Sequence, residues 1–530
     1  MIEALAPEKR RGCRWVQVLL LSAGLGSPAA VIAQDTRPAP AAPKGAPTAK
    51  GAPAPASKDQ AKDAPAAKEA EPEPEPEAEA PANQLGRPGS VEVFKDELAE
   101  KALEVFKSVP GLRDCNPTVI NQVKAMAANA ATTDREVIQR FVQGMAYRLI
   151  DKGNINGLIA PPPEQKATSF AARAIKDASD NLIDPINSAR LAKNDSFLRE
   201  YNRALIDTLP KLLDNNLVSR VEAVIVLGQT GDPAIVPIML AQLKNKEQTV
   251  WVKLWAARGL YNVVDGGQKV DTVLSVKNAS DAGKALADFL SEELPWPAQV
   301  RGLEALGAMR QAALPTAPQK VDMATAAIKL LSDPSLRPEV RSAAAWALGM
   351  VRVNPNAAKY NFPLVAYLSG SLSADLADLS LSRISENKTF SEYMAGLLLG
   401  PVFQSFNGVD GVRESGLLKV PASHPNYGPN AQYIRQIAEL QAAVARAAVE
   451  VVRVAPGAQA RAEKDLGDRV AALKAFLEKN PPKDFHLIPD GEEYRPAPAE
   501  KVAEESPAPA PAPAVAKGAA RPTTGGPGGR

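Results

Sequence analysis

The sequence predicts an all-α fold, a solenoid of stacked antiparallel helix pairs, and three observations support this prediction. Residues 220–243 (RVEAVIVLGQTGDPAIVPIMLAQL) hold two short amphipathic stretches with a turn between them. Weaker copies of the first half of this stretch recur downstream. Apolar residues also repeat at three- to four-residue intervals on both sides of these copies, which is the period of a helix with one buried face.

Residues 220–243 contain the signals for a helix, a joint and a second helix. Gly228 ends the first helix, Asp232 is the expected N-cap, and Pro233 starts the second helix. Pro237 is expected within the first turn of that helix, because a proline further inside would break it. The apolar face of the second helix comprises Ile235, Val236, Met239, Leu240 and Leu243.

A small residue followed by leucine marks each copy of the repeat. The anchor pairs are Val226–Leu227, Gly259–Leu260, Ala305–Leu306 and Ala347–Leu348. Their leucines are 33, 46 and 42 residues apart. Irregular spacing that reaches about 40 to 47 residues is typical of HEAT-type arrays and differs from the strict period of tetratricopeptide repeats.

The repeat segments resemble a known family. VEAVIVLGQTGDPAIVPIMLAQL, VKLWAARGLYNV and VRSAAAWALGMV are similar to the HEAT-like repeats first described in phycobilisome lyases. The resemblance covers residues 217–353, roughly a quarter of the chain. It implies helix pairs that stack around an extended concave binding surface, and it implies no particular activity. The third copy departs from the pattern, because Ala298 and Gln299 replace the usual Val-Arg, and residues 264–294 are longer than one helix and a turn.

Helical regions flank the repeat region (214–354). In the N-terminal region (84–213), Asn116 is the expected cap of a helix that starts at Pro117. The predicted helix before it contains Phe94, Leu98, Leu103 and Phe106. The predicted helix after it begins at Thr133 or Asp134 and ends at Gly153. Two more helices are expected at about 165–192 and 195–213. In the C-terminal region (355–495), helices are expected at 362–381, 391–403, 431–454 and 468–479. A Gly/Pro-rich loop fills 407–430, and a loop of that length is usually functional or disordered.

The two ends of the chain predict export and extended arms. Four basic residues precede an uncharged run of 19 residues, 15–33, with small residues suited to cleavage before Gln34. Residues 1–33 are therefore a predicted signal peptide, and the alternative is an uncleaved membrane anchor at 15–33. Residues 34–83 and 496–530 are rich in Pro and Ala and have almost nothing apolar to bury, so both arms are predicted to be disordered. The expected location is the periplasm or cell envelope.

Composition and motifs argue against several classes of function. The formal charge is +2, from 62 basic and 60 acidic side chains, which gives no basic footprint for nucleic acid. The sequence lacks a phosphate-cradling glycine loop and a paired-cysteine metal motif, and its only histidines are His424 and His486. Cleavage would leave Cys115 as the single cysteine, interpreted as a partly buried structural thiol. We expect no catalytic residue, no cofactor and no metal.

Seven residues are candidates for contact with a partner. They are Gln242, Lys244, Trp296, Asp322, Lys329, His424 and Tyr427. The first two and Asp322 and Lys329 lie on predicted second helices, whereas His424 and Tyr427 lie in the 407–430 loop. Trp296 lies between two prolines in a predicted turn, where an exposed aromatic ring suits an interface. The other aromatic stripe, Trp251 with Trp255, and also Trp346, are interpreted as core.

These features predict a non-enzymatic scaffold or adaptor that binds a protein partner in the cell envelope and is itself monomeric. One alternative is an enzyme or enzyme subunit, by analogy with lyases that carry the same repeats, with a site near the 407–430 loop. Another is a tethered cell-wall spacer in which the proline-rich arm carries the function.

Overall fold

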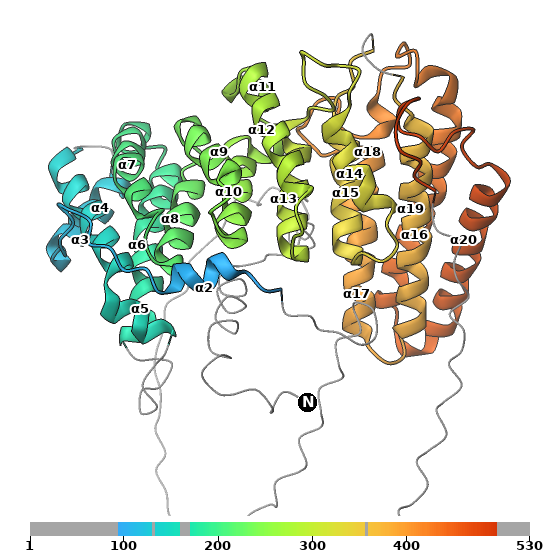
Figure 1. Ribbon diagram of the computed structural model, residues 1–530. Helices are drawn as coiled ribbons and strands as arrows, with labels where there is room; N and C mark the ends of the chain where they lie inside the picture. Colours follow the sequence, from blue (N-terminus) through green and yellow to red (C-terminus); the bar gives the residue numbers. More distant parts are fainter. Residues whose placement is uncertain (1–93, 130–132, 160–169, 356–358, 496–530) are drawn as a thin grey trace, which may run out of the picture.

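The computed structural model describes residues 94–129, 133–159, 170–355 and 359–495. The predicted signal peptide and both predicted arms lie outside the described residues. Across these ranges the fold is all-α, with two isolated β-bridges and no strand. Its helices stand side by side in a row that follows the order of the chain, from α3 and α4 at one end to α20 at the other (Figure 1). No helix in the described part is both long enough and apolar enough to cross a bilayer.

The N-terminal region begins with a short helix that lies apart from the others, along the ends of α8 and α10 (Figure 1). Its helices are α2 (Glu97–Leu103), α3 (Pro117–Ala128), α4 (Arg135–Ile150), α5 (Lys152–Ile159), α6 (Phe170–Leu191) and α7 (Asp195–Thr208). The predicted caps are confirmed: Asn116 accepts a hydrogen bond from the Val119 amide, and Asp134 accepts from the amides of Glu136 and Val137. The predicted stop at Gly153 is wrong. Asp151 ends α4 and its side chain accepts from the Asn154 amide, so a new helix, α5, runs through Gly153.

The region in which repeats were predicted, 214–354, consists of short helices. They are α8 (Leu217–Gln229), α9 (Val236–Lys244), α10 (Val250–Val263), α11 (Val270–Val273), α12 (Val276–Leu290), α13 (Trp296–Met309), α14 (Asp322–Ser332) and α15 (Pro338–Met350). Asp232 caps a short 3-10 turn at Pro233–Ile235, and Pro237 lies in the first turn of α9, as predicted. The long stretch after α10 holds the extra helix α11 before α12.

The first helix of each pair packs against the first helix of the next. Contacts join α8 to α10, α10 to α13 and α13 to α15, and the anchor leucines of all four are buried. Glycine follows the anchor leucine in three of them, and a Cβ at Gly307 would lie 2.8 Å from the Cα of Ala347. A Cβ at Gly228 would lie 3.1 Å from the Cα of Gly259. Close backbone approach between neighbouring first helices thus explains the glycines at 228 and 307, whereas a Cβ at Gly349 would lie 2.5 Å from the Cα of Ser405.

The C-terminal region consists of long helices packed on one another. They are α16 (Phe362–Arg383), α17 (Lys388–Leu397), α18 (Phe403–Asn407), α19 (Ala431–Arg453) and α20 (Gln459–Lys479), with a π-turn at Leu398–Val402. Helices α16, α19 and α20 contact one another. The last helix begins nine residues before the predicted start at 468, because Ala462 and Leu466 extend its buried stripe. The other residues of its first turns are mostly polar, so the helical repeat of apolar residues is weak there and the sequence did not predict this part of the helix.

Candidate polypeptide-binding edge

The starts of α8, α10, α13 and α15 form one edge of the row, and a chain of contacts places them next to one another. Lys253 in the first turn of α10 binds both carboxylate oxygens of Glu292, just before α13, at 2.9 Å. Arg337, just before α15, stacks on the ring of Trp296 at the start of α13, with 4.6 Å from the guanidinium carbon to the ring centroid. We call this set of four helix starts the edge.

An extended segment of the same chain crosses the first half of the edge. Residues 94–107, which we call the strap, include α2 and are drawn in blue beneath α8 and α10 in Figure 1. One carboxylate oxygen of Asp96 caps α2 by accepting from the Ala99 amide at 3.0 Å. The other accepts from the backbone amide of Val250, the first residue of α10, also at 3.0 Å. A negative side chain is favourable at a helix start, where amides lack partners within the helix.

Two adjacent asparagines at the start of α8 bind the backbone of the strap. The Asn215 side chain accepts from the Lys107 amide at 3.2 Å and donates to the Lys107 carbonyl at 2.7 Å. Asn216 donates to the carbonyl of Leu103 at 2.6 Å while its own oxygen caps α8 through Val218. These bonds reach only backbone atoms of the strap, so they place no demand on its side chains.

Apolar contacts also hold the strap against the edge. Ala99 and Ala102 are buried, and Phe94, Leu103 and Phe106 are half-buried against the main core. The ammonium group of Lys152 lies 5.1 Å from the centroid of the Phe106 ring. The first half of the edge therefore binds a short polypeptide through small side chains, backbone hydrogen bonds and one carboxylate.

The second half of the edge carries aromatic and charged side chains. Trp296 does not lie in a turn, as the sequence predicted; it is the first residue of α13 and is half-buried. Arg337 binds the buried carboxylate of Glu339 at 3.0 and 3.3 Å while stacking on Trp296. Burial and the Glu339 carboxylate together raise the pKa of Tyr393, on α17. Neither α13 nor α15 receives a hydrogen bond from the side chain of its N-cap residue.

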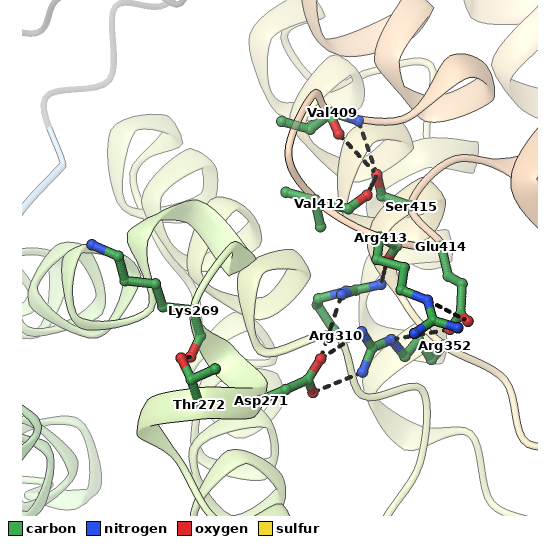
Figure 2. A network of polar contacts seen from close by, with 10 residues as sticks. All are labelled: Lys269, Asp271, Thr272, Arg310, Arg352, Val409, Val412, Arg413, Glu414 and Ser415. Atoms are coloured by element: carbon green, nitrogen blue, oxygen red, sulfur yellow. Dashed lines mark hydrogen bonds and ion pairs between the residues drawn. The ribbon is translucent and has the colours of Figure 1, made fainter.

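A polar network joins the opposite ends of α13 and α15 to the loop after α18. Figure 2 shows Arg310 and Arg352 converging on Asp271 of α11, and Arg352 binds both carboxylate oxygens at 2.7 Å. The side chain of Arg310 is 2 % exposed and donates to the carbonyl of Arg413. Burial, followed by the charge of Arg352, lowers the pKa of Arg310 to about 10. With Glu414 at 3.8 Å from the Nε of Arg352, the network acts as a clasp between the repeat region and that loop.

Four of the predicted partner-contact residues lie on second helices. Lys244, Asp322 and Lys329 are exposed, and Gln242 is half-buried. Gln242 accepts from Gln248 at 2.7 Å, and the oxygen of Gln248 accepts from the amide of Thr249, the N-cap of α10. Lys244 ends α9 on the same side, so these two lie beside the edge. Lys329 instead binds Glu492 at 2.9 Å, and Asp322 starts α14.

The other two, His424 and Tyr427, lie inside the 407–430 loop. They are 5 % and 4 % exposed, and both rings meet Phe362 edge-on, with centroids 5.1 and 5.6 Å away. Burial lowers the pKa of His424, and the backbone of Val353 partly opposes this shift. This loop is folded around an aromatic cluster, and its histidine is a packing residue.

Two further features contain reactive or ionisable side chains. Cys115 is half-buried against Gly144, whose added Cβ would lie 2.5 Å from the sulfur atom, and burial raises the pKa of its thiol. An open cavity of about 530 Å³ between α4 and α6 is lined by Asp114, Asp151, Asp177 and Asp180, with Arg148 bound to Asp114 at 2.8 Å. Among the described residues no group of three His, Cys, Asp or Glu side chains is placed to hold a metal ion.

Comparisons with protein-family models, with curated proteins and with solved structures found no significant match. The sequence did not predict that Asn215, Asn216 and Asp96 hold the strap at the first half of the edge. Asn216 is recognisable as a helix cap, but the partner of Asn215 lies 108 residues earlier in the chain. The adjacent Asn215–Asn216 pair is the one local signal that could have pointed to a bound backbone.

Proposed function

We propose that this protein is a non-enzymatic scaffold or adaptor that binds protein partners through its helical surface in the cell envelope. The observation that supports this most is the strap: the edge already binds a polypeptide segment, and Asn215 and Asn216 do so through backbone atoms alone. A surface that binds the backbone and small side chains of a segment of its own chain is suited to bind a similar segment of another protein. The half of the edge at α13 and α15, with Trp296 and Arg337, is where we place the partner.

We also propose that the row of helices is a HEAT-like solenoid, and the packing of its first helices supports this proposal. Parallel first helices pack in succession, each copy buries its anchor leucine, and glycine allows their backbones to approach closely. Each pair then contacts mainly its neighbours, and repetition produces an extended surface along which helix starts recur. Trp296 and Arg337 suit an interface, because tryptophan and arginine are enriched among residues that dominate binding energy.

The cellular setting of the proposal rests on the ends of the sequence. A basic start followed by an uncharged run of 19 residues is typical of an export signal, and the proline-rich arms at 34–83 and 496–530 would act as spacers on either side of the helical row. Such arms would let the helical part reach a partner at a distance from its point of attachment.

The test is co-purification from cell-envelope extracts with the tagged full chain, followed by mass spectrometry. A stable partner should be recovered with the unaltered protein and with Lys277→Ala, a matched change at an exposed position away from the edge. Trp296→Ala should lose that partner while the variant keeps its helical content by circular dichroism and a cooperative thermal transition. Recovery of the same partner by all three proteins would contradict binding at this edge, and a chain that stays alone in every preparation would contradict the adaptor function.

A further inference from the structure

The part of the long loop that leads into α19, residues 421–430, is held on the core by two aromatic rings. The rings of His424 and Tyr427 both meet Phe362 of α16 edge-on, with centroids 5.1 and 5.6 Å away. We propose that protonation of His424 releases this segment from Phe362, so that the loop opens in acid. The inference goes beyond partner binding and does not depend on it.

His424 is also the residue around which the segment folds. Its amide donates to the carbonyl of Pro421 at 2.9 Å, and its own carbonyl accepts from the amides of Tyr427 and Gly428 at 3.1 and 2.9 Å. These bonds join residues at most four positions apart, so they shape the segment without attaching it to a helix. Its attachment to α16 comes from the two rings.

The hydrogen bond of the His424 ring suits its neutral form. Nδ1 accepts from the amide of Asn426 at 3.3 Å, so the proton of the neutral ring is on Nε2. Nε2 is buried and has no hydrogen-bond partner in the part of the chain that the structure describes. A second proton would go to Nδ1, where it would face the Asn426 N–H, and the ring that carries the charge is 5 % exposed. Protonation thus removes one bond and adds the cost of a buried charge.

The titratable groups around the ring do not balance that charge. Beside Phe362 lies Tyr360, with 4.7 Å between the two ring centroids. The loop contributes Tyr427 and, further out, the exposed Lys419, and α19 contributes Arg435, whose positive charge acts on Tyr427. These groups are neutral or positive, so none of them favours a cation at this place.

The charged groups of the flanking segments are paired elsewhere. Arg352, next to Val353, is bound in the clasp. In the C-terminal segment beside the start of α16, the carboxylate of Asp484 binds the ring of His486 at 2.6 Å. Burial therefore lowers the pKa of His424, and the backbone of Val353 opposes only part of this effect.

The pKa of His424 is lower in the closed loop than in the open one, which fixes the direction of the effect. Above the ordinary pKa of 6.5 the ring is neutral in both forms, and the closed loop keeps its full stability. Below it the open form takes up the proton first, so the equilibrium moves to the open loop. At pH 5 the shift reaches at most about thirtyfold.

The opening is confined to residues 421–430. It uncovers the rings of Phe362 and Tyr360, which are 3 % and 2 % exposed in the closed form. The earlier part of the loop, residues 408–416, is held separately, because the Gly416 amide donates to the Gly349 carbonyl at 2.7 Å and the clasp binds Glu414. That part provides an internal reference.

The first test measures the titration of His424 itself. The chain has two histidines, so the untagged full chain labelled at histidine gives two ring signals by NMR, assigned with His424→Gln and His486→Gln. The His424 signal should titrate with a pKa below 6.5. A pKa at or above 6.5 would overturn the inference, because the charged ring would then be stable in its closed site.

The second test measures opening by hydrogen exchange of the full chain at pH 7.5 and pH 5.0, corrected for the intrinsic effect of pH on amide exchange. Residues 421–430 should exchange between severalfold and about thirtyfold faster at pH 5.0, while residues 408–416 respond little. His424→Gln should abolish this acid response, because its amide oxygen still accepts a hydrogen bond but does not titrate. His486→Gln, at a half-buried position outside the loop, should keep it.

A further variant covers the case in which His424→Gln already exchanges fast at pH 7.5. His424→Phe keeps a ring against Phe362 and then serves as the variant that does not titrate. If residues 421–430 of the parent protein exchange alike at both pH values, or if the acid response persists without His424, the inference is wrong. The experiment involves no partner, so its failure would leave the proposed adaptor function standing.

Discussion

Asp96 and Val250 are 154 residues apart in the chain and are joined by a hydrogen bond of 3.0 Å from the Val250 amide to the Asp96 carboxylate. The other oxygen of the same carboxylate caps α2. One side chain thus shapes the strap and attaches it to the row of helices. It also shows the kind of ligand that a helix start of this edge accepts.

Asp96→Ala should release the strap without unfolding the rest of the chain. Loss of an N-cap costs about 0.5–2 kcal/mol, and here the same change removes the bond to Val250. Limited proteolysis should cut between Phe94 and Lys107 several-fold faster, while the global thermal transition moves little. Lys95→Ala, at an exposed neighbouring position, is the control. Equal cleavage of both variants would show that the apolar contacts alone hold the strap.

Gly307→Ala should destabilise the repeat region. The new Cβ would lie 2.7 Å from the ring of Trp346 and 2.8 Å from the Cα of Ala347, so α13 and α15 would have to separate. Overpacking of this kind costs about 1–3 kcal/mol in denaturant unfolding. The matched control is Gly467→Ala in α20, where nothing lies within 4 Å. That change should stabilise by about 0.5–1 kcal/mol, because alanine is the better helix former. The same sign for both would contradict the packing argument.

Glu222 should make stability depend on pH. It is buried in α8, and burial raises its pKa from 4.5 to about 7, despite a hydrogen bond from Ser179 and the nearby charge of Lys176. The pKa is higher in the folded chain, so the group favours folding fully below pH 4.5, and this contribution is lost as the pH rises to about 7. The free energy of unfolding falls by about 3 kcal/mol across this pH range because of this group.

Glu222→Gln should therefore raise the free energy of unfolding at pH 8 and leave it nearly unchanged at pH 4.5. Urea unfolding at both values measures this, with Glu97→Gln, exposed in α2, as the control. If the substitution has the same effect at both pH values, the carboxyl group does not titrate as described. A loss of stability at pH 8 would show that the carboxylate makes contacts the amide cannot replace.

Asp271→Ala should loosen the clasp between the repeat region and the loop after α18. Arg310 is buried and Arg352 would lose both of its 2.7 Å bonds, so two guanidinium groups would face each other with only Glu414 nearby. Loss of hydrogen bonds to a charged group costs about 1.5–3 kcal/mol. Hydrogen exchange of residues 408–416 should speed up.

The control for the clasp is Asp281→Ala, which breaks an ion pair with the exposed Lys277 within α12. Exposed pairs of this kind contribute about 0–1 kcal/mol, so this variant should match the parent protein. If both variants exchange alike in the 408–416 loop, the network around Arg310 contributes no more than a surface ion pair.

The sequence by itself determined the features that depend on neighbouring residues. The caps at Asn116, Asp134 and Asp232 were predictable, because a cap needs only a side chain two or three residues from an amide. Two predicted helix boundaries were wrong. A new helix, α5, starts directly after Asp151, and α20 begins earlier than predicted because its first turns contain few apolar residues.

Only the tertiary structure decided what lies against the edge and what lies inside. His424 looked available in a long loop but packs on Phe362, and Trp296 looked like a turn residue but starts α13. The seat of the strap depends on Asn215 and Asp96, whose partners are 108 and 154 residues away. No periodicity or propensity encodes such pairs, because they form only when stacking brings the starts of successive first helices side by side.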